Sequence, residues 1–559
     1  MAELVLGPML RHVDETSATV WVETDGPCRV SVHGPTAAAA TTHTFCVGGH
    51  HYALVMVENL HPGTVIPYQV QLDDTVVWPP EQDPFPPCVI RTLGHGGPLR
   101  VIFGSCRAAA PHEPPYSLEI ASNPEARGVD ALRAHGLRML RQTPSEWPDL
   151  LMLVGDQVYA DDVSPGVRRQ LAGTTRPMGL PQDSVANFEE YTWLYREAWT
   201  PDVERWLFSV VPSAMIFDDH DMIDDWNISE AWVRDTRREP WWQDHIIGGL
   251  VSYWIYQHLG NLSPQQVRAE GILQEALNTT DAEPVLRRWA EQSEAFTPVP
   301  GGYRFSYVRD LGPVRLVVVD SRNGRVLRPG ARAMVDADEW DWVVKQCQVP
   351  CRDLLIASSL PVLVPGGLHD LQVWSERLCD GKWGRWAAKV GERLRRALDL
   401  EDWAAFANSF ATFMQLLSEL GRGAYGPAPR TISILSGDIH FSYRAELHFP
   451  SEAGVTSHIN QLVSSPMRNA LAGRDRKVLA FGASSAGRAI GRVLRRSVGA
   501  RAGDMQWKLT EGPFFANEMS LLTLDDDTAE YRIEQASPDE DGRPTLSIIA
   551  QVDLAPTGR

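Results

Sequence analysis

The sequence predicts an α/β fold, in which helices flank a layered β-sheet and a small all-β domain precedes them. Short apolar runs that end in glycine or polar residues recur through the middle of the chain, as expected for strands buried on both faces of a largely parallel sheet. Stretches with helical periodicity alternate with these runs after residue 98. Before that point the chain shows only short β-like runs separated by Gly, Pro and Asp turns.

The first predicted domain, residues 1–97, is a small antiparallel β-sandwich. Its β-like runs are residues 18–22, 29–33, 52–57 and 68–72, and a Pro- and Gly-rich stretch over residues 78–98 marks its end. No cluster of His, Cys or acidic residues falls in this region. We therefore expect a docking or lid domain and not a catalytic one.

The second predicted domain covers residues 98–559 and contains a tryptophan-rich helical insertion near 187–300. Most of these tryptophans are expected to fill the core between the helices and the sheet. A basic segment follows later, at residues 474–501, with eight Lys or Arg and one acid. Its helical pattern fits three alternatives: an acidic partner, a membrane surface, or a solvated face of the protein itself.

The composition of the chain disfavours several classes of protein. The 559 residues carry a net charge of −19, which disfavours a broad nucleic-acid-binding surface. No apolar run approaches the length of a membrane span, about 18 residues, and the N-terminus lacks the pattern of a signal peptide. The seven scattered cysteines indicate reduced thiols, and Cys347 and Cys351 alone are a weak metal signal. We expect a cytoplasmic protein, and the oligomeric state is left open.

One strand-like run organises the second domain. Residues 150–154 are apolar and lead into Gly155 and Asp156, and Tyr159, Asp161 and Asp162 follow. Ligands of open α/β sheets bind at the carboxyl ends of the strands, which is where Asp156 is expected. The alternative for this loop alone is a capped turn with solvated acids.

Three further apolar runs end in the same way. Residues 101–103 lead to Cys106 and Arg107, residues 214–217 lead to Asp218–Asp221, and residues 431–435 lead to Asp438 and His440. Because the ends of parallel strands meet at one edge of a sheet, these side chains are expected to form a single site.

Together these motifs resemble a known family. The sequences GSCR, GDQVY, FDDHD followed by DDWN, VVVDSR and SGDIH occur in the order typical of the PhoD-like alkaline phosphatases, a branch of the metallophosphoesterases. The resemblance spans about residues 98–530. It implies a metallophosphoesterase-like β-sandwich flanked by helices as the catalytic domain. It also implies hydrolysis of phosphate mono- or diesters, small or polymeric, by attack of a metal-bound hydroxide.

The resemblance also implies a two-metal centre. Asp156 takes the place of the bridging carboxylate, and Cys106, Tyr159 and His440 are the remaining ligands of one ion. A phenolate and a thiolate on one ion favour iron as Fe3+. Asp156, Asp219 and Asp438 supply only oxygen to the second ion, which favours Ca2+ or another hard divalent cation. Its remaining ligand is not placed, and Ser359 and Asn227 are candidates.

Further roles follow from the same resemblance. His220 is expected to protonate the leaving group or to hold phosphate, with Asp221 orienting its imidazole. Arg107 and Arg322 are expected to clamp phosphate oxygens, and a structural salt bridge is the alternative for each arginine.

Two rival functions are weighed against hydrolysis. A catalytically silent scaffold or phosphate-ligand sensor predicts the loss of a metal ligand, yet every family position that can be placed is filled. A metal oxidoreductase needs a redox-active divalent state of the iron, which tyrosinate ligation disfavours. For the hydrolase, these residues do not decide between phosphate monoesters and diesters.

Overall fold

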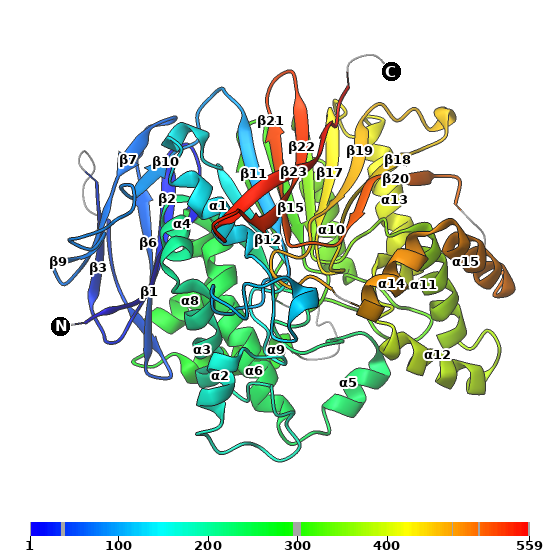
Figure 1. Ribbon diagram of the computed structural model, residues 1–559, viewed down its shortest axis with the longest axis horizontal. Coiled ribbons are helices and arrows are strands. Elements are labelled where there is room, and N and C mark those ends of the chain that lie inside the picture. The colour runs from blue at the N-terminus through cyan, green and yellow to red at the C-terminus, as the bar shows by residue number, and fades with distance from the viewer. Residues whose placement is uncertain (1, 35–39, 295–302, 472, 501–502, 557–559) are drawn as a thin grey trace.

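A computed structural model describes residues 2–34, 40–294, 303–471, 473–500 and 503–556 (Figure 1). Two large sheets occupy its centre, helices cover them, and three small sheets lie at one end. None of the helices in these residues combines the length and hydrophobicity that a membrane span requires. All seven cysteines are free.

The first central sheet has six strands in the order β13-β12-β11-β21-β22-β23. The strands are β11 (Leu99–Gly104), β12 (Leu150–Val154), β13 (Ser213–Ile216), β21 (Glu518–Leu524), β22 (Ala529–Pro538) and β23 (Pro544–Asp553). Strands β11, β12 and β13 are parallel, and the C-terminal strands extend the sheet in antiparallel fashion from β11. Every residue of β12 is buried, as its unbroken apolar run predicts.

The second central sheet has seven strands in the order β14-β15-β16-β17-β19-β18-β20. The strands are β14 (Tyr307–Leu311), β15 (Val314–Val319), β16 (Asp353–Ser358), β17 (Thr431–Ser436), β18 (Ser442–His448), β19 (His458–Val463) and β20 (Gln506–Phe514). Strands β15, β16, β17 and β19 run parallel, so their carboxyl ends share one edge.

The two central sheets meet directly at that edge. The Ser464 hydroxyl, just after β19, donates to the carbonyl of Phe103 in β11 at 3.0 Å. A Cβ on Gly437, just after β17, would lie 2.6 Å from the carbonyl oxygen of Val154 in β12. Glycine is therefore required for this approach, and the ends of β11, β12 and β17 are brought together.

The N-terminal region is all-β, as predicted. Its sheets have the orders β1-β2-β6-β5, β4-β3-β8-β9 and β10-β7. The strands are β1 (Leu4–Val13), β2 (Ser17–Thr24), β3 (Arg29–His33), β4 (Ala40–His43), β5 (Phe45–Val47), β6 (His50–Glu58), β7 (Val65–Pro67), β8 (Gln69–Leu72), β9 (Thr75–Trp78) and β10 (Val89–Arg91). The buried Arg11 donates to the carbonyls of Tyr256 and Gln257 at 2.6 and 2.7 Å, so this region is joined to the helices by buried contacts. The boundary at residue 97 stays a prediction.

Helices cover the lower part of the molecule in Figure 1. The helices between β11 and β16 are α1 (Ala131–Met139), α2 (Pro165–Leu171), α3 (Phe188–Trp199), α4 (Asp202–Val210), α5 (Glu230–Thr236), α6 (Trp242–Ser252), α7 (Pro264–Ala269), α8 (Gly271–Leu277), α9 (Glu283–Ser293) and α10 (Ala337–Cys347). Of these, α2, α3, α5, α6, α8 and α9 lie in that lower part. Of the nine tryptophans over residues 187–300, only Trp193 is not buried. Most of them therefore fill the core, as expected from the sequence.

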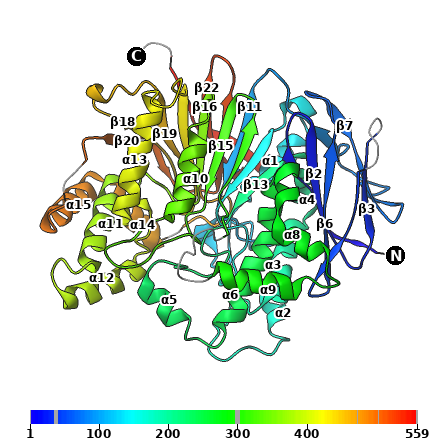
Figure 2. The ribbon, with the colours of Figure 1, turned by 180° about the vertical axis from the view of Figure 1, so that it is seen from behind.

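A separate group of helices lies at the end opposite the N-terminal sheets (Figures 1 and 2). It comprises α11 (Gly366–Cys379), α12 (Arg385–Ala397), α13 (Ala407–Gly421), α14 (Gly473–Ala483) and α15 (Ser485–Ser497). Within the basic segment predicted at 474–501, residues 474–483 belong to α14 and residues 485–497 form α15, and residue 501 lies outside the described residues.

A buried histidine, His258, makes the stability of the fold sensitive to acid. His258 is surrounded by aromatic rings, with Phe305 at 5.1 Å, and burial together with Arg11 and Arg304 lowers its pKa from 6.5 to about 3. The unfolded chain therefore binds a proton that the folded chain does not, and stability falls as the pH drops from 6.5 toward 3. Between pH 7 and pH 5 this group alone is expected to cost about 2 kcal/mol.

We expect His258→Phe to remove that contribution. Urea unfolding at pH 7 and pH 5 should show that the free energy of unfolding decreases less in the variant than in wild type. His43→Gln, at an exposed position, is the matched control and should behave as wild type. If the free energy of unfolding decreased as much in His258→Phe as in wild type between pH 7 and pH 5, His258 would not be the source of the acid sensitivity.

Candidate metal centre

The site lies where loops after the parallel strands converge. Cys106 follows β11, Asp156 follows β12, Asp219 follows β13, and Asp438 and His440 follow β17. Three of these residues have positive φ angles, which residues other than glycine seldom adopt. The φ angle is 55° at Cys106, 66° at Asp438 and 55° at His440. Strained backbone of this kind concentrates at functional sites, because the surrounding structure must hold it in place.

Three carboxylates form the centre of the site. Asp156, Asp219 and Asp438 each place an oxygen within 4.8 Å of the other two. Asp156 is fully buried, and neither of its carboxylate oxygens has a hydrogen-bond partner among the described residues. A buried carboxylate without a donor is unfavourable unless a cation balances it, so the residues present fit a bound metal ion.

The electrostatics agree with this interpretation. Burial, together with Asp218 and Asp219, raises the pKa of both Asp156 and Asp438 well above the usual value. Asp219 differs, because Arg322 and His220 outweigh the effect of burial and lower its pKa. The negatively charged carboxylates thus repel one another, and a cation between them would relieve that repulsion.

Of the other predicted ligands, Cys106 and His440 lie outside the set of side-chain atoms within 4.8 Å of one another. The buried Cys106 thiol lies 3.4 Å from the backbone carbonyl oxygen of Asp438. Burial raises the pKa of that thiol well above its usual value, and Asp156 and Asp438 raise it further. The Tyr159 hydroxyl accepts a hydrogen bond from the Asn469 side chain at 2.9 Å.

His440 is oriented by a backbone hydrogen bond. Its Nδ1 lies 2.8 Å from the carbonyl oxygen of Asn469, and a carbonyl can only accept, so Nδ1 carries the proton. Burial lowers the pKa of His440 to about 4, which keeps the ring neutral near pH 7. Nε2 is then free to act as a metal ligand, the usual arrangement in metal sites.

His220 and Asp221 lie differently from what the sequence predicts. Nδ1 of His220 pairs with Asp161 at 2.8 Å, and the imidazole ring lies 4.9 Å from the ring of Tyr159. Burial opposes protonation of His220, but Asp161 outweighs it and raises the pKa well above the usual value. The prediction that Asp221 orients this imidazole is wrong, because Asp161 has that place.

Asp221 holds the loops together instead. Its carboxylate accepts from the backbone N–H groups of Gln157, Val158 and Asp218, and from the side chain of Gln257. It therefore joins the loop after β12 to the loop after β13. This role supports the position of Asp156 and His220 without contact to a substrate.

The two predicted phosphate clamps are both buried in ion pairs. Arg322 is fully buried, with nitrogens that face Asp218, Asp219 at 3.1 Å and Glu401 at 2.6 Å. It also lies 3.8 Å from Asp438. Arg322 thus balances charge beside the three carboxylates, which corresponds to the salt-bridge alternative.

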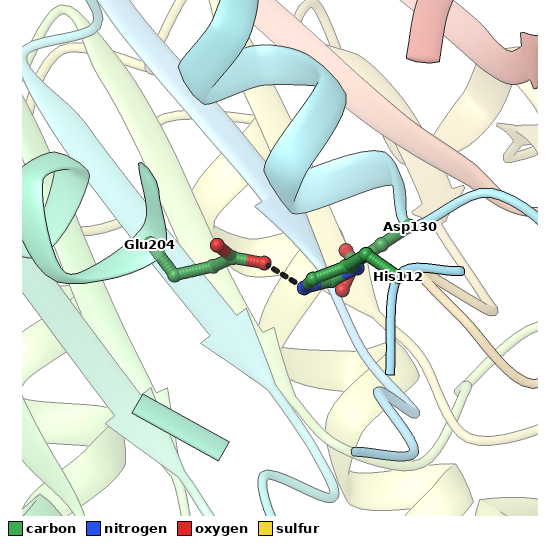
Figure 3. A group of neighbouring side chains, drawn as sticks. All are labelled: His112, Asp130 and Glu204. Atoms are coloured by element: carbon green, nitrogen blue, oxygen red, sulfur yellow. Dashed lines mark ion pairs between the residues drawn. The ribbon is translucent and has the colours of Figure 1, made fainter. Parts of the chain in front are cut away.

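Arg107 faces away from the three carboxylates. Its guanidinium contacts Asp130 and Glu204, at 2.9 and 3.0 Å, and the Ala198 carbonyl. His112, Asp130 and Glu204 are a second acidic group whose atoms lie close enough to hold a metal ion, with His112 2.9 Å from Glu204 (Figure 3). Arg107 already supplies the positive charge there, and its contacts lower the pKa of Asp130 to about 2 against the effect of burial. This group is therefore a buried ion cluster that supports the loop carrying Cys106.

The candidates for the unplaced ligand are engaged elsewhere. The Ser359 hydroxyl bonds the Ser321 hydroxyl at 2.9 Å, and the Asn227 amide donates to the Arg322 carbonyl at 3.1 Å.

Comparisons with known proteins agree with this architecture. Residues 1–90 match a family described as "Domain of unknown function (DUF7800)". No curated protein matches the chain by sequence. A solved structure titled "Structure of PhoD" aligns with a TM-score of 0.54 at 11% identity, covering 98% of this chain and 89% of that chain. The chain has a PhoD-like fold.

A second solved structure has little structural similarity to this chain. "The type III pullulan hydrolase from Thermococcus kodakarensis" covers 99% of this chain and 98% of that chain at 13% identity, but with a TM-score of 0.16. The similarity to PhoD concerns the fold alone.

Two site residues were missed in the sequence. Asn469 contacts both Tyr159 and His440 and lies in the segment after β19, another parallel strand that ends at the same edge. The apolar run of β19 followed by SSPMRN could have indicated it. Glu401, which pairs with Arg322 and Arg325, lies between helices and gives no such signal.

Proposed function

We propose that this protein is a metal-dependent phosphoesterase. The observation that carries the proposal is Asp156, a fully buried carboxylate without hydrogen-bond donors, placed beside Asp219 and Asp438 at the ends of parallel strands. Oxygen ligands around a shared carboxylate are suited to metal-assisted attack on phosphorus. The PhoD-like fold supports the same reaction class.

In this proposal each residue of the site has a separate role in hydrolysis. Asp156, Asp219 and Asp438 would hold the cations, and Arg322 balances the negative charge of the neighbouring Asp218 and Glu401. Bound ions supply a water of lowered pKa and neutralise charge on the phosphoryl oxygens. His220 would give a proton to the departing oxygen, and its pairing with Asp161 and its exposure of about a quarter support this role.

We further propose two different ions. Cys106, Tyr159 and His440 with Asp156 form a mixed sulfur, phenolate and imidazole set that favours Fe3+. Asp219 and Asp438 with Asp156 offer only oxygen, which favours Ca2+. The neutral ring of His440, with Nε2 free of its backbone contact, supports its place in the first set.

Tyr159 provides a spectroscopic test of the iron site. A phenolate bound to ferric iron gives a charge-transfer band in the visible range, so protein loaded with iron should be coloured. Tyr159→Phe removes the phenolate and should bleach or shift the band while iron analysis still shows metal bound through Asp156. A band unchanged in Tyr159→Phe, or a colourless active enzyme filled with zinc, would contradict the assignment.

The function itself is tested on paired substrates. Protein purified without chelator should hydrolyse an aryl phosphate monoester, an aryl diester or both, and metal analysis of the same sample should show bound ions. Chelation should abolish hydrolysis, and added metal should restore it. Tight metal binding without turnover of any phosphoester would favour a phosphate-binding scaffold instead.

A further inference from the structure

The helices opposite the N-terminal sheets carry an exposed surface of unusual composition. We call it the α12/α15 surface and define it as the exposed side chains of residues 382–398 and 481–497. Fourteen large apolar side chains are exposed in the described part of the chain, and six of them lie in these two short segments. They are Trp383, Trp386, Leu398, Phe481, Ile490 and Val493.

The tryptophans are the clearest sign. Of the nineteen tryptophans, all within the described residues, only Trp383 and Trp386 are exposed, at 51% and 79%. Tryptophan is rarely left in water, because its large apolar ring gains most from burial. Its amphipathic ring favours the boundary between lipid headgroups and acyl chains.

Helix α15 is packed with its apolar side outward. A Cβ on Gly491 would lie 2.9 Å from the carbonyl oxygen of Gly367 in α11, so α15 contacts α11 through its glycines. The ion pair between Arg495 and Asp370, at 2.7 Å, fixes the same orientation. Ile490 and Val493 therefore stay exposed, at 52% and 66%. A helix of a soluble protein ordinarily turns such residues inward.

The surface is also strongly basic. Residues 382–396 and 485–497 together hold ten Lys or Arg and one acid, in a chain of net charge −19. Arg395 is buried, and Arg395, Arg396 and Arg495 pair with acids. Seven of the ten basic side chains are exposed: Lys382, Arg385, Lys389, Arg393, Arg488, Arg492 and Arg496. Lys389 and Arg393 follow Trp386 at helical spacing, and Arg488, Arg492 and Arg496 form a row along α15. Among the described residues, no ion pair forms at Lys389, Arg393 or Arg492.

The start of α12 lies beside the end of α15. Nζ of Lys382, just before α12, is 3.9 Å from where a Cβ on Gly499 would stand, just after α15. Both helices pack on α11 at the same end of the molecule in the two views (Figures 1 and 2). The aromatic, aliphatic and basic side chains can therefore contact one partner.

We propose that the α12/α15 surface docks the protein on an anionic lipid bilayer. Exposed tryptophan and branched aliphatic side chains beside rows of Lys and Arg are the composition of helices that lie in the membrane interface. A second copy of the chain would place like charges face to face, which disfavours a symmetric dimer through this surface. The proposal is independent of the phosphoesterase assignment.

The test is binding of the full-length protein to vesicles. Wild type should sediment with vesicles of phosphatidylcholine and phosphatidylglycerol, bind poorly to phosphatidylcholine alone, and bind less at high salt. Lys389→Gln with Arg393→Gln should weaken binding about 30-fold, since each basic residue contributes about fivefold. Trp383→Ser with Trp386→Ser should abolish binding. Both double variants should melt as wild type does, because the substituted side chains are exposed.

A matched control separates this surface from apolar exposure in general. Met178 is 81% exposed at another place on the molecule, and Met178→Ser should bind vesicles as wild type does. Failure of wild type to bind anionic vesicles at low salt would overturn the proposal. So would equal binding by the tryptophan variant, or a self-association in ultracentrifugation that this variant abolishes.

Discussion

Replacing Asp156 with asparagine is expected to abolish hydrolysis and, at the same time, to stabilise the metal-free protein. The carboxylate is fully buried, and neither of its oxygens accepts a hydrogen bond from a described residue. Groups that only support metal ligands contribute about 10–100-fold to metal affinity or activity. Loss of the shared ligand itself should therefore lower turnover by about 10³-fold or more.

The gain in stability has an electrostatic cause. Asp156, Asp219 and Asp438 place oxygens within 4.8 Å of one another, so removing one charge relieves repulsion in the metal-free state. The expected gain is on the order of 1–3 kcal/mol in the free energy of unfolding. Metal ions stabilise wild type by binding the folded state, and this stabilisation should be smaller or absent in Asp156→Asn.

Thermal unfolding with and without metal, together with metal analysis, checks both effects. Asp162→Asn is the matched control, because Asp162 is exposed on the same loop and should change neither metal content nor stability. Near-normal metal content and hydrolysis in Asp156→Asn would contradict the two-metal proposal. A purely structural Asp156 would instead make the metal-free variant less stable than wild type.

The outline of this site could be predicted because its signals are local. Five apolar residues before Gly155 make β12 a buried strand, and a buried parallel strand must end at the ligand-binding edge of its sheet. The same pattern before Cys106, Asp219 and Asp438 places them at that edge. The fold class and the convergence of the three carboxylates thus follow from strand periodicity.

The pairing of side chains could not be predicted in the same way. Asp221 is next to His220 in sequence, but its carboxylate turns inward to accept three backbone N–H groups, and Asp161 reaches the imidazole from another loop. An arginine after a strand looks the same in sequence whether it faces the site or the interior. Arg107 faces the interior because Asp130 and Glu204, distant in sequence, lie there.

Replacing His220 with asparagine is expected to slow alkyl phosphoesters far more than nitrophenyl phosphoesters. A general acid typically contributes about 10²–10⁴-fold, and it matters most when the departing oxygen is strongly basic. Nitrophenolate leaves readily without a proton, whereas an alkoxide does not. A residue that only held phosphate would give similar losses for both esters, because the charge on the phosphoryl group is alike in each.

Two acids near His220 sharpen the test, because the structure gives them different roles. Asp161 lies 2.8 Å from Nδ1 of His220, so Asp161→Asn should show a weaker form of the same preference for nitrophenyl esters. Asp221 bonds the loop backbone and not the imidazole, so Asp221→Asn should lower stability and slow both esters by a similar factor. Rates for both esters, measured for wild type and the three variants at matched metal occupancy, distinguish these roles. Equal losses of rate for the two esters in His220→Asn would remove proton donation from the proposed mechanism. A preference for nitrophenyl esters in Asp221→Asn but not in Asp161→Asn would overturn the assignment of Asp161 as the residue that orients His220.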